Sequence, residues 1–277
     1  MSGPQLFYVY TVVESGAATP DTREIGGLSG SGVTVVDDGV LAAVAEPVDP
    51  AEYGETALPR RLEDLDRLTH LARTHHQVVA AVGGSVTTVP LRLATVCRGE
   101  EGVLRLLAEG RERLSHALAR VAGAEEWGVK LYSADSAPAA TTAPAPDRPG
   151  TAAGPPEGGT GAGSGRDYLR RRLGDRRRRE ERAGLAAATA EQLHRQLAAR
   201  ASGSVLHAPQ QAQLSGSPDT NVLNAAYLVP RDARQAFLDT VPGPADLPSG
   251  LRREITGPWV PYSFTQAAAD DPHGQER

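Results

Sequence analysis

The chain has 277 residues, a hydrophobic fraction of 40% and a formal net charge of −5. This suits one large or two modest domains and argues against a dedicated nucleic-acid binder. The one cysteine, Cys97, excludes an internal disulfide and fits a reducing cytoplasm; it follows an apolar run and is interpreted as a small buried hydrophobe. No run approaches the ~20 apolar residues of a membrane span, and no signal-peptide pattern opens the chain, so we expect a soluble protein.

The first half begins with strand patterns. Residues Leu6–Val13 are apolar on both faces, as in a central strand. Val33–Val36 and Val40–Ala45 flank Asp37-Asp38-Gly39, a strong hairpin turn. Two helices follow from apolar residues at helical spacing. The first stripe comprises Leu58, Leu62, Leu65 and Leu68, and the second Val103, Leu107, Leu114, Leu118 and Val121.

The remaining strands of the first half complete one sheet. Val78–Val82 and Val89–Leu93 are expected as strands around the turn Gly83-Gly84, and Trp127, Val129 and Leu131 alternate like a last strand. The order is roughly β-ββ-α-ββ-α-β. The natural packing places two helices on one face of an antiparallel sheet, a variation on the ferredoxin-like sandwich.

A change of composition divides the chain. Residues Ser133–Gly165 contain no aliphatic side chain larger than Ala, so we expect a flexible linker. It separates an N-terminal α+β domain, residues 1–132, from a C-terminal one, residues 166–264. Residues 265–277 are polar and are expected to be disordered.

The second half opens with a long helix predicted from Arg166 to about Ala201. Short strands are expected at Val205–His207 and Ala225–Val229, a short helix at Arg231–Thr240 and a last strand at Leu251–Thr256. These strands are too few for a large independent sheet. We therefore expect a smaller α+β domain that packs against the first, and the fold class is α+β.

The search for a catalytic or metal site finds little. The glycine-rich stretch GGLSGSG is followed by a strand rather than a helix and supplies no lysine, so a flexible loop is favoured over a phosphate-binding loop. His70, His75 and His76 lack the partners of a zinc shell. The carboxylates Glu63, Asp64 and Asp66 look like a solvated surface.

Arginines provide two candidate contact sites. Seven lie within ten residues of the long helix, among them Arg176, Arg177, Arg178 and Arg179. Such a helix can grip phosphate, but no aromatic residues interleave to stack on bases, so a solvated face or a contact with an acidic protein is favoured. Arg92 lies among apolar neighbours of an expected strand. It is either an ordinary outward-facing residue or a buried arginine that needs a carboxylate partner.

Aromatic residues gather in two places, although aromatics form only 4% of the chain. One cluster surrounds Trp127; the other holds Trp259, Tyr262 and Phe264 between and after Pro258 and Pro261. The prolines remove backbone donors, so this segment cannot be a fully paired central strand. The rings are interpreted as a rigid docking or locking element that plugs the seam between the halves, with a partner contact as the alternative.

Several stretches in this order resemble the GvpF/GvpL family of gas vesicle proteins. They are FYVYTVV, LAAVAEPV, HHQVVAAV, VPLRLATV, EWGVKLY, RDYLRRRL, AAYLVPR and EITGPWVPYSF, spanning Phe7 to Phe264. The chain departs from the commoner family pattern at Leu93–Cys97, where many members have Phe-Gly-Thr-Val-Phe. The resemblance implies a modified ferredoxin-like N-terminal domain and a C-terminal α+β domain.

The resemblance also implies a function. Members are minor components or accessory factors in the assembly of gas vesicles, and they contact the main shell protein GvpA and other Gvp proteins. By resemblance this chain acts likewise, in the cytoplasm and associated with gas vesicles, without a cofactor and not as an enzyme. The family offers no established catalytic residues. Two other classes stay open: a ferredoxin-like ligand-binding regulatory module and a nucleic-acid binder that uses the basic helix.

Overall fold

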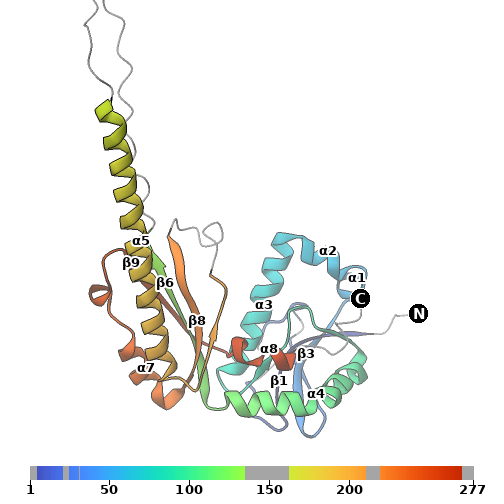
Figure 1. Cartoon of the computed structure of the whole chain (residues 1–277). Helices are drawn as coiled ribbons and strands as arrows, with labels where there is room; N and C mark the ends of the chain where they lie inside the picture. Colours follow the sequence, from blue (N-terminus) through green and yellow to red (C-terminus); the bar gives the residue numbers. More distant parts are fainter. Residues whose placement is uncertain (1–4, 21–24, 31, 135–161, 210–218, 270–277) are drawn as a thin grey trace, which may run out of the picture.

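The computed structural model describes residues 5–20, 25–30, 32–134, 162–209 and 219–269. In these residues two antiparallel sheets lie side by side, each covered by helices (Figure 1). The α+β class predicted from the sequence is confirmed. The first sheet with its two long helices is a variation on the ferredoxin-like architecture.

The first sheet has the strand order β2-β3-β1-β4, and β5 also pairs with β1. Its strands are β1 (Leu6–Glu14), β2 (Thr34–Asp37), β3 (Leu41–Val48), β4 (Val89–Pro90) and β5 (Val96–Arg98). Strand β1 is buried along its length except at Glu14, as expected of a central strand apolar on both faces. The predicted β2–β3 hairpin is also confirmed.

Two long helices, α3 (Leu65–Gly83) and α4 (Gly99–Val121), cover opposite faces of this sheet. Successive side chains of β1 point to alternate faces, so Tyr8 packs with α3 and Val9 packs with α4. The expectation that both helices cover one face is therefore wrong. Because β1 is apolar on both sides, each face needs its own cover.

The predicted strand Val78–Val82 is also wrong, since these residues end α3. Val78 and Val82 lie one turn apart and are fully buried against the sheet together with Leu71 and His75. The spacing from Leu71 through His75 and Val78 to Val82 is helical. Packing of this stripe overrides the β preference of a valine-rich run. The leucine stripe before it spans two helices, α2 (Leu58–Glu63) and α3, after the short α1 (Pro50–Tyr53).

The second sheet has the order β7-β8-β6-β9. Its strands are β6 (Ala124–Ser133), β7 (Gly203–Leu206), β8 (Thr220–Pro230) and β9 (Leu251–Trp259). Strand β6 pairs with β8 on one side and β9 on the other. Strand β6 was expected to complete the first sheet, but it lies in the middle of the second sheet. The second half of the chain supplies only three described strands, and β6 completes a four-stranded sheet with them. The boundaries of independent domains remain a proposal.

Helix α5 (Ala162–Ala198) confirms the long helix predicted at the start of the second half. Its last turns pack on the second sheet through Ala190, Leu193 and Leu197. A 3₁₀ turn (Arg231–Ala233), α7 (Arg234–Thr240) and a second 3₁₀ turn (Pro244–Asp246) connect β8 to β9. Most of the predicted linker Ser133–Gly165 lies outside the described residues. Helix α8 (Tyr262–Ala269) extends into the tail that was expected to be disordered, and residues 270–277 are not described.

Candidate functional site

The most distinctive element is the segment 257–265, which we name the C-terminal clasp. It begins with the last residues of the edge strand β9, which include a cis Gly257–Pro258 peptide, and continues into α8. As expected for a proline-bearing strand, β9 pairs with β6 alone among the described strands. We call the first sheet with α3 and α4 the first lobe, and the second sheet with α5 and α7 the second lobe. The clasp carries the chain from the second sheet back to the first, and α8 lies between the two lobes (Figure 1).

Phe264 fills the seam between the lobes. It is 5% exposed and packs in one cluster with Val121 at the end of α4 and with Ala226 and Leu228 of β8. The guanidinium of Arg120 lies 5.8 Å from the centre of its ring. Burial of this ring against residues from both lobes joins the two cores. Phe264 is therefore the ring of the C-terminal aromatic cluster that lies buried in this seam.

Val260 and Tyr262 extend the same contact toward the first lobe. Both are partly buried against the core beneath α3. Val260 lies so close to Gly83 that a Cβ atom there would approach its Cγ2 to 2.5 Å. Tyr262 faces His76, with ring centres 6.1 Å apart. These contacts fix the clasp on the end of α3.

A buried carboxylate anchors the clasp from the other side. Glu126 of β6 accepts hydrogen bonds from the backbone N–H of Ser263 at 2.8 Å and from its hydroxyl at 2.7 Å. Burial raises the pKa of Glu126, and the two hydrogen bonds from Ser263 offset only part of this effect. The carboxylate of Glu126 thus accepts from the backbone N–H of Ser263, which lies in the first turn of α8 and has no acceptor within the helix.

Trp259 lies at the surface, and the expectation that its ring plugs the seam is wrong. The residue is 43% exposed, and its ring centre lies 5.6 Å from that of His76. Trp259 ends the edge strand β9, and none of the strands that the structure describes pairs with its outer side. Gly257, two residues before it, has a φ of +132°, and a Cβ atom there would lie 2.8 Å from the carbonyl oxygen of Glu126 and 3.1 Å from the Trp127 ring. Only glycine fits this position.

Trp127 is buried, in contrast. It is 8% exposed within the core of the second sheet, and its Nε1–H donates to Glu125 Oε1 at 2.8 Å. Glu125 also forms a bidentate ion pair with Arg234: Oε1 accepts from Nε at 2.6 Å, and Oε2 accepts from Nη2. Burial alone would raise the pKa of Glu125, but the hydrogen bonds from Arg234 and Trp127 outweigh it and lower the pKa.

These elements enclose a cleft of about 390 Å³ between the lobes. The end of α3, the start of β6, the 3₁₀ turn before α7 and the clasp all contribute to its walls. The lining mixes apolar and charged groups, among them His76, Glu125, Arg231, Arg234, Trp259 and Val260. The volume lies at the low end of the range for small-molecule sites. The half-exposed Trp259 ring is therefore part of a concave surface.

The predicted arginine sites lie elsewhere. Arg92 is exposed rather than buried. Arg176, Arg177 and Arg178 make ion pairs within α5, to Glu180, Glu181 and Asp175. Arg179 is exposed on the same helix. None of these side chains lines the cleft.

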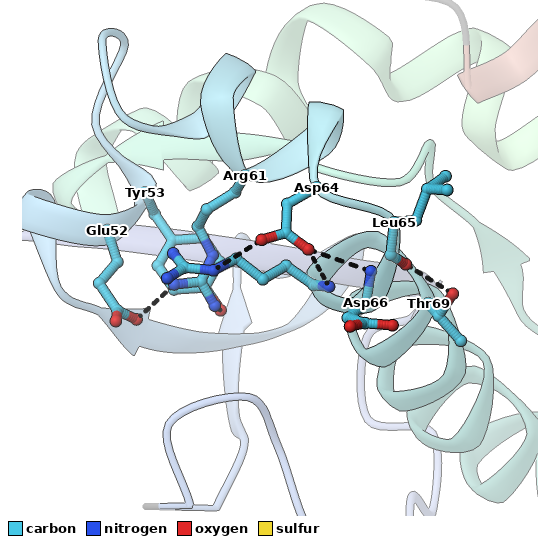
Figure 2. A network of polar contacts seen from close by, with 8 residues as sticks. Glu52, Tyr53, Arg61, Asp64, Leu65, Asp66 and Thr69 are labelled. Atoms are coloured by element: carbon cyan, nitrogen blue, oxygen red, sulfur yellow. Dashed lines mark hydrogen bonds and ion pairs between the residues drawn. The ribbon is translucent and has the colours of Figure 1, made fainter.

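Among the acidic residues at the start of α3, Asp64 caps the helix. Figure 2 shows Asp64, which accepts hydrogen bonds from the backbone N–H groups of Asp66 and Arg67 at the start of α3. In the same figure Arg61 bridges to Glu52, with Nη1 and Oε2 2.9 Å apart. These groups satisfy a helix end and one another, as expected for a solvated surface.

The remaining candidates serve the core of the first lobe. His75 is buried and its Nδ1 lies 3.0 Å from the Tyr8 hydroxyl. The glycine-rich stretch covers a buried carboxylate, because Leu28 and Ser29 donate backbone N–H groups to Glu46. Cys97 is half-buried beside α4. Within the described ranges, no group of three or more His, Cys, Asp or Glu is placed to hold a metal ion.

Sequence reasoning missed Glu126, which holds the clasp through Ser263, the clasp residue Val260 that packs against Gly83, and the Glu125–Arg234 pair beside the cleft. One signal was present, since two adjacent acidic residues in an apolar strand must find partners on both faces of the sheet. The identity of those partners depends on the fold. In the part of the chain that the structure describes, no helix is long and apolar enough to cross a membrane.

Comparison with known proteins agrees with this architecture. The family model described as gas vesicle synthesis protein GvpL/GvpF matches residues 6–266. The chain is 41% identical to gas vesicle protein L of Streptomyces sp. (strain CB03234), covering 99% of this chain and 97% of the relative. It is 28% identical to gas vesicle protein L1 of Halobacterium salinarum, covering 93% and 89%.

Solved structures share the fold. The crystal structure of GvpF from Anabaena sp. PCC7120 is similar with a TM-score of 0.62 at 17% identity, over 99% of each chain. GvpF from Microcystis aeruginosa gives a TM-score of 0.60 at 19% identity, over 95% of this chain and 100% of that one. With the family match over nearly its whole length, the chain belongs to the GvpL/GvpF family of gas vesicle synthesis proteins.

Proposed function

We propose that the chain is a non-catalytic assembly factor that binds the main shell protein GvpA and other Gvp proteins during gas vesicle formation. Its place of action is the cytoplasm, at the growing vesicle. Family membership supports the gas vesicle role. The observation that carries the contact is the half-exposed Trp259 at the cleft between the lobes.

Exposed tryptophan is a good candidate for a binding contact. Trp, Tyr and Arg dominate the residues that contribute most to protein interfaces, particularly where a pocket excludes water. The cleft offers Trp259 together with Arg231 and Arg234. Since the clasp is fixed to both lobes through Phe264 and Glu126, the ring is held in place before a partner arrives. Such pre-organisation reduces the entropy lost on binding.

The test is binding of the Trp259→Ala variant to immobilised GvpA and to each other Gvp protein, measured by biolayer interferometry. We expect a loss of at least about 2 kcal/mol of binding free energy, as for a central aromatic contact. Leu65→Ala is the matched control, because Leu65 is 77% exposed and lies on the far end of α3. Unchanged binding by the Trp259 variant would reject this contact site.

A ligand-binding regulatory module is the second candidate, and the cleft is the observation in its favour. At about 390 Å³ it has room for a small molecule, and charged groups converge beside an aromatic ring. The discriminating measurement is a thermal-shift screen of small anions and aromatic metabolites. A specific rise in melting temperature that Trp259→Ala abolishes would favour this function over protein binding.

A further inference from the structure

The first part of α5, residues Arg166–Leu185, is exposed among the residues that the structure describes, and we name it the stalk. Every residue in it is exposed except Gly174, which is half-buried. The first buried side chain of the helix is Ala186. At 1.5 Å per residue the stalk is about 30 Å long. Figure 1 shows it projecting beyond the second sheet.

The stalk is strongly basic. Residues 166–182 hold nine arginines and four acidic residues, a net charge of +5. Because the whole chain carries −5, the remaining residues together carry −10. The stalk is therefore the positive region of an otherwise acidic protein. Charges of this kind steer association with oppositely charged surfaces.

The side-chain contacts within the stalk stabilise its helix only weakly. The ion pairs Arg176–Glu180, Arg177–Glu181 and Arg178–Asp175 have N–O distances of 2.8, 3.1 and 2.7 Å and lie in solvent. Exposed pairs of this kind contribute little. Gly174 and Gly184 further weaken the helix. A helix whose side chains are mostly charged and that makes no packing contact with the other described residues is marginal in water, so a partner surface would stabilise it.

Apolar side chains on the stalk indicate what kind of surface it fits. Leu169 and Leu173 are 58% and 66% exposed and lie one turn apart on the same face, with Arg176 one further turn along. Leucines next to arginines match a protein surface with an apolar strip and acidic rim. Tyr168 is the single aromatic residue of the stalk, whereas single-stranded RNA binding uses several stacked rings. The acidic body also disfavours RNA and anionic membranes.

We propose that the stalk is a docking arm for the acidic surface of another gas vesicle protein. The inference rests on the proposed function, since it assumes that the chain binds such proteins. It adds a second contact surface, away from the cleft, and states the chemistry of the partner. A partner that engages both the stalk and Trp259 would gain from the linkage of the two contacts in one chain.

The test uses the full-length chain and each other gas vesicle protein of the same organism, purified separately. The variant replaces Arg176–Arg179 by Gln; the matched control carries Glu180→Gln and Glu181→Gln on the same helix. Binding is measured at about 50 and about 300 mM NaCl. We expect an acidic partner whose affinity falls about tenfold in the arginine variant and with added salt, but holds or rises in the control. Hydrogen exchange at 166–185 slows in the complex.

Other outcomes overturn the proposal in distinguishable ways. If partners bind the arginine variant like wild type but lose affinity for Trp259→Ala, the proposed function stands and the docking arm is rejected. If wild type binds single-stranded RNA or phosphatidylglycerol vesicles through the stalk, and no acidic gas vesicle protein does, the partner class is wrong. If no gas vesicle protein binds wild type, both proposals fail.

Discussion

Trp127 and Trp259 belong to neighbouring strands of one sheet but have opposite surroundings. Trp127 lies in β6, between β8 and β9, and is 8% exposed. Trp259 ends the edge strand β9 and is 43% exposed. Both rings sit in aromatic clusters that look alike in the sequence. The difference teaches that strand position, rather than residue type, decides which ring builds the core and which remains available to a partner.

The largest expected effect is on stability, when each tryptophan ring is truncated in turn. We expect Trp127→Ala to reduce the free energy of unfolding by about 3–5 kcal/mol, because it empties a buried site. Trp259→Ala should change it by no more than about 1 kcal/mol, because the ring is half in solvent. Urea unfolding of the two purified variants measures both values. Equal losses would mean that Trp259 is a core residue after all.

The same contrast holds for two adjacent histidines of α3. His75 is buried beside Tyr8, whereas His76 faces the clasp rings. Burial lowers the pKa of His75 from 6.5 to about 4. Between these values the unfolded chain binds more protons than the folded one. The stability that neutral His75 contributes is therefore present above pH 6.5 and is lost as the pH falls toward 4.

We expect this loss to be about 3 kcal/mol, the equivalent of the pKa shift. His75→Gln should reduce the fall in unfolding free energy between pH 6.5 and pH 4, while His70→Gln, an exposed position, should leave it as in wild type. Chemical unfolding at a series of pH values gives the difference between the variants. An identical pH profile for His75→Gln and wild type would show that His75 is not held neutral.

The smallest expected effect on stability comes from relief of backbone strain. Gly257 of the clasp has a φ of +132°, and Ala94 in the β4–β5 loop has a φ of +67°. The backbone N–H of Ala94 donates to the Tyr8 hydroxyl at 3.0 Å. We expect Ala94→Gly to stabilise the protein by up to about 1 kcal/mol, because glycine adopts this conformation without strain. A drop in melting temperature would contradict this.

Much of the architecture followed from periodicity and turn residues. Strand β1, the β2–β3 hairpin and helices α4 and α5 were predicted, since each has a pattern that only one structure satisfies. The proline pair correctly indicated an edge strand at β9. Val78–Val82 was mistaken for a strand because the valine preference was given more weight than the helical spacing that begins at Leu71.

The site was harder to predict, because it depends on pairings distant in sequence. Ser263 and Glu126 are 137 residues apart, and Arg234 and Glu125 are 109 apart. No local pattern specifies such contacts. The aromatic cluster marked the right segment, but which ring would plug the seam was decided by the turn from β9 into α8. That turn directs Phe264 inward and leaves Trp259 at the rim.

The most direct test of the account is gas vesicle formation in a strain that lacks the gene and is complemented with wild type, Trp259→Ala or Leu65→Ala. Vesicles are measured by the loss of light scattering when pressure collapses them, and immunoblots measure the amount of each protein. We predict that Trp259→Ala accumulates to the wild-type level yet forms few or no vesicles, while Leu65→Ala forms them normally. Normal vesicle formation with Trp259→Ala at equal protein level would contradict a partner contact at the cleft.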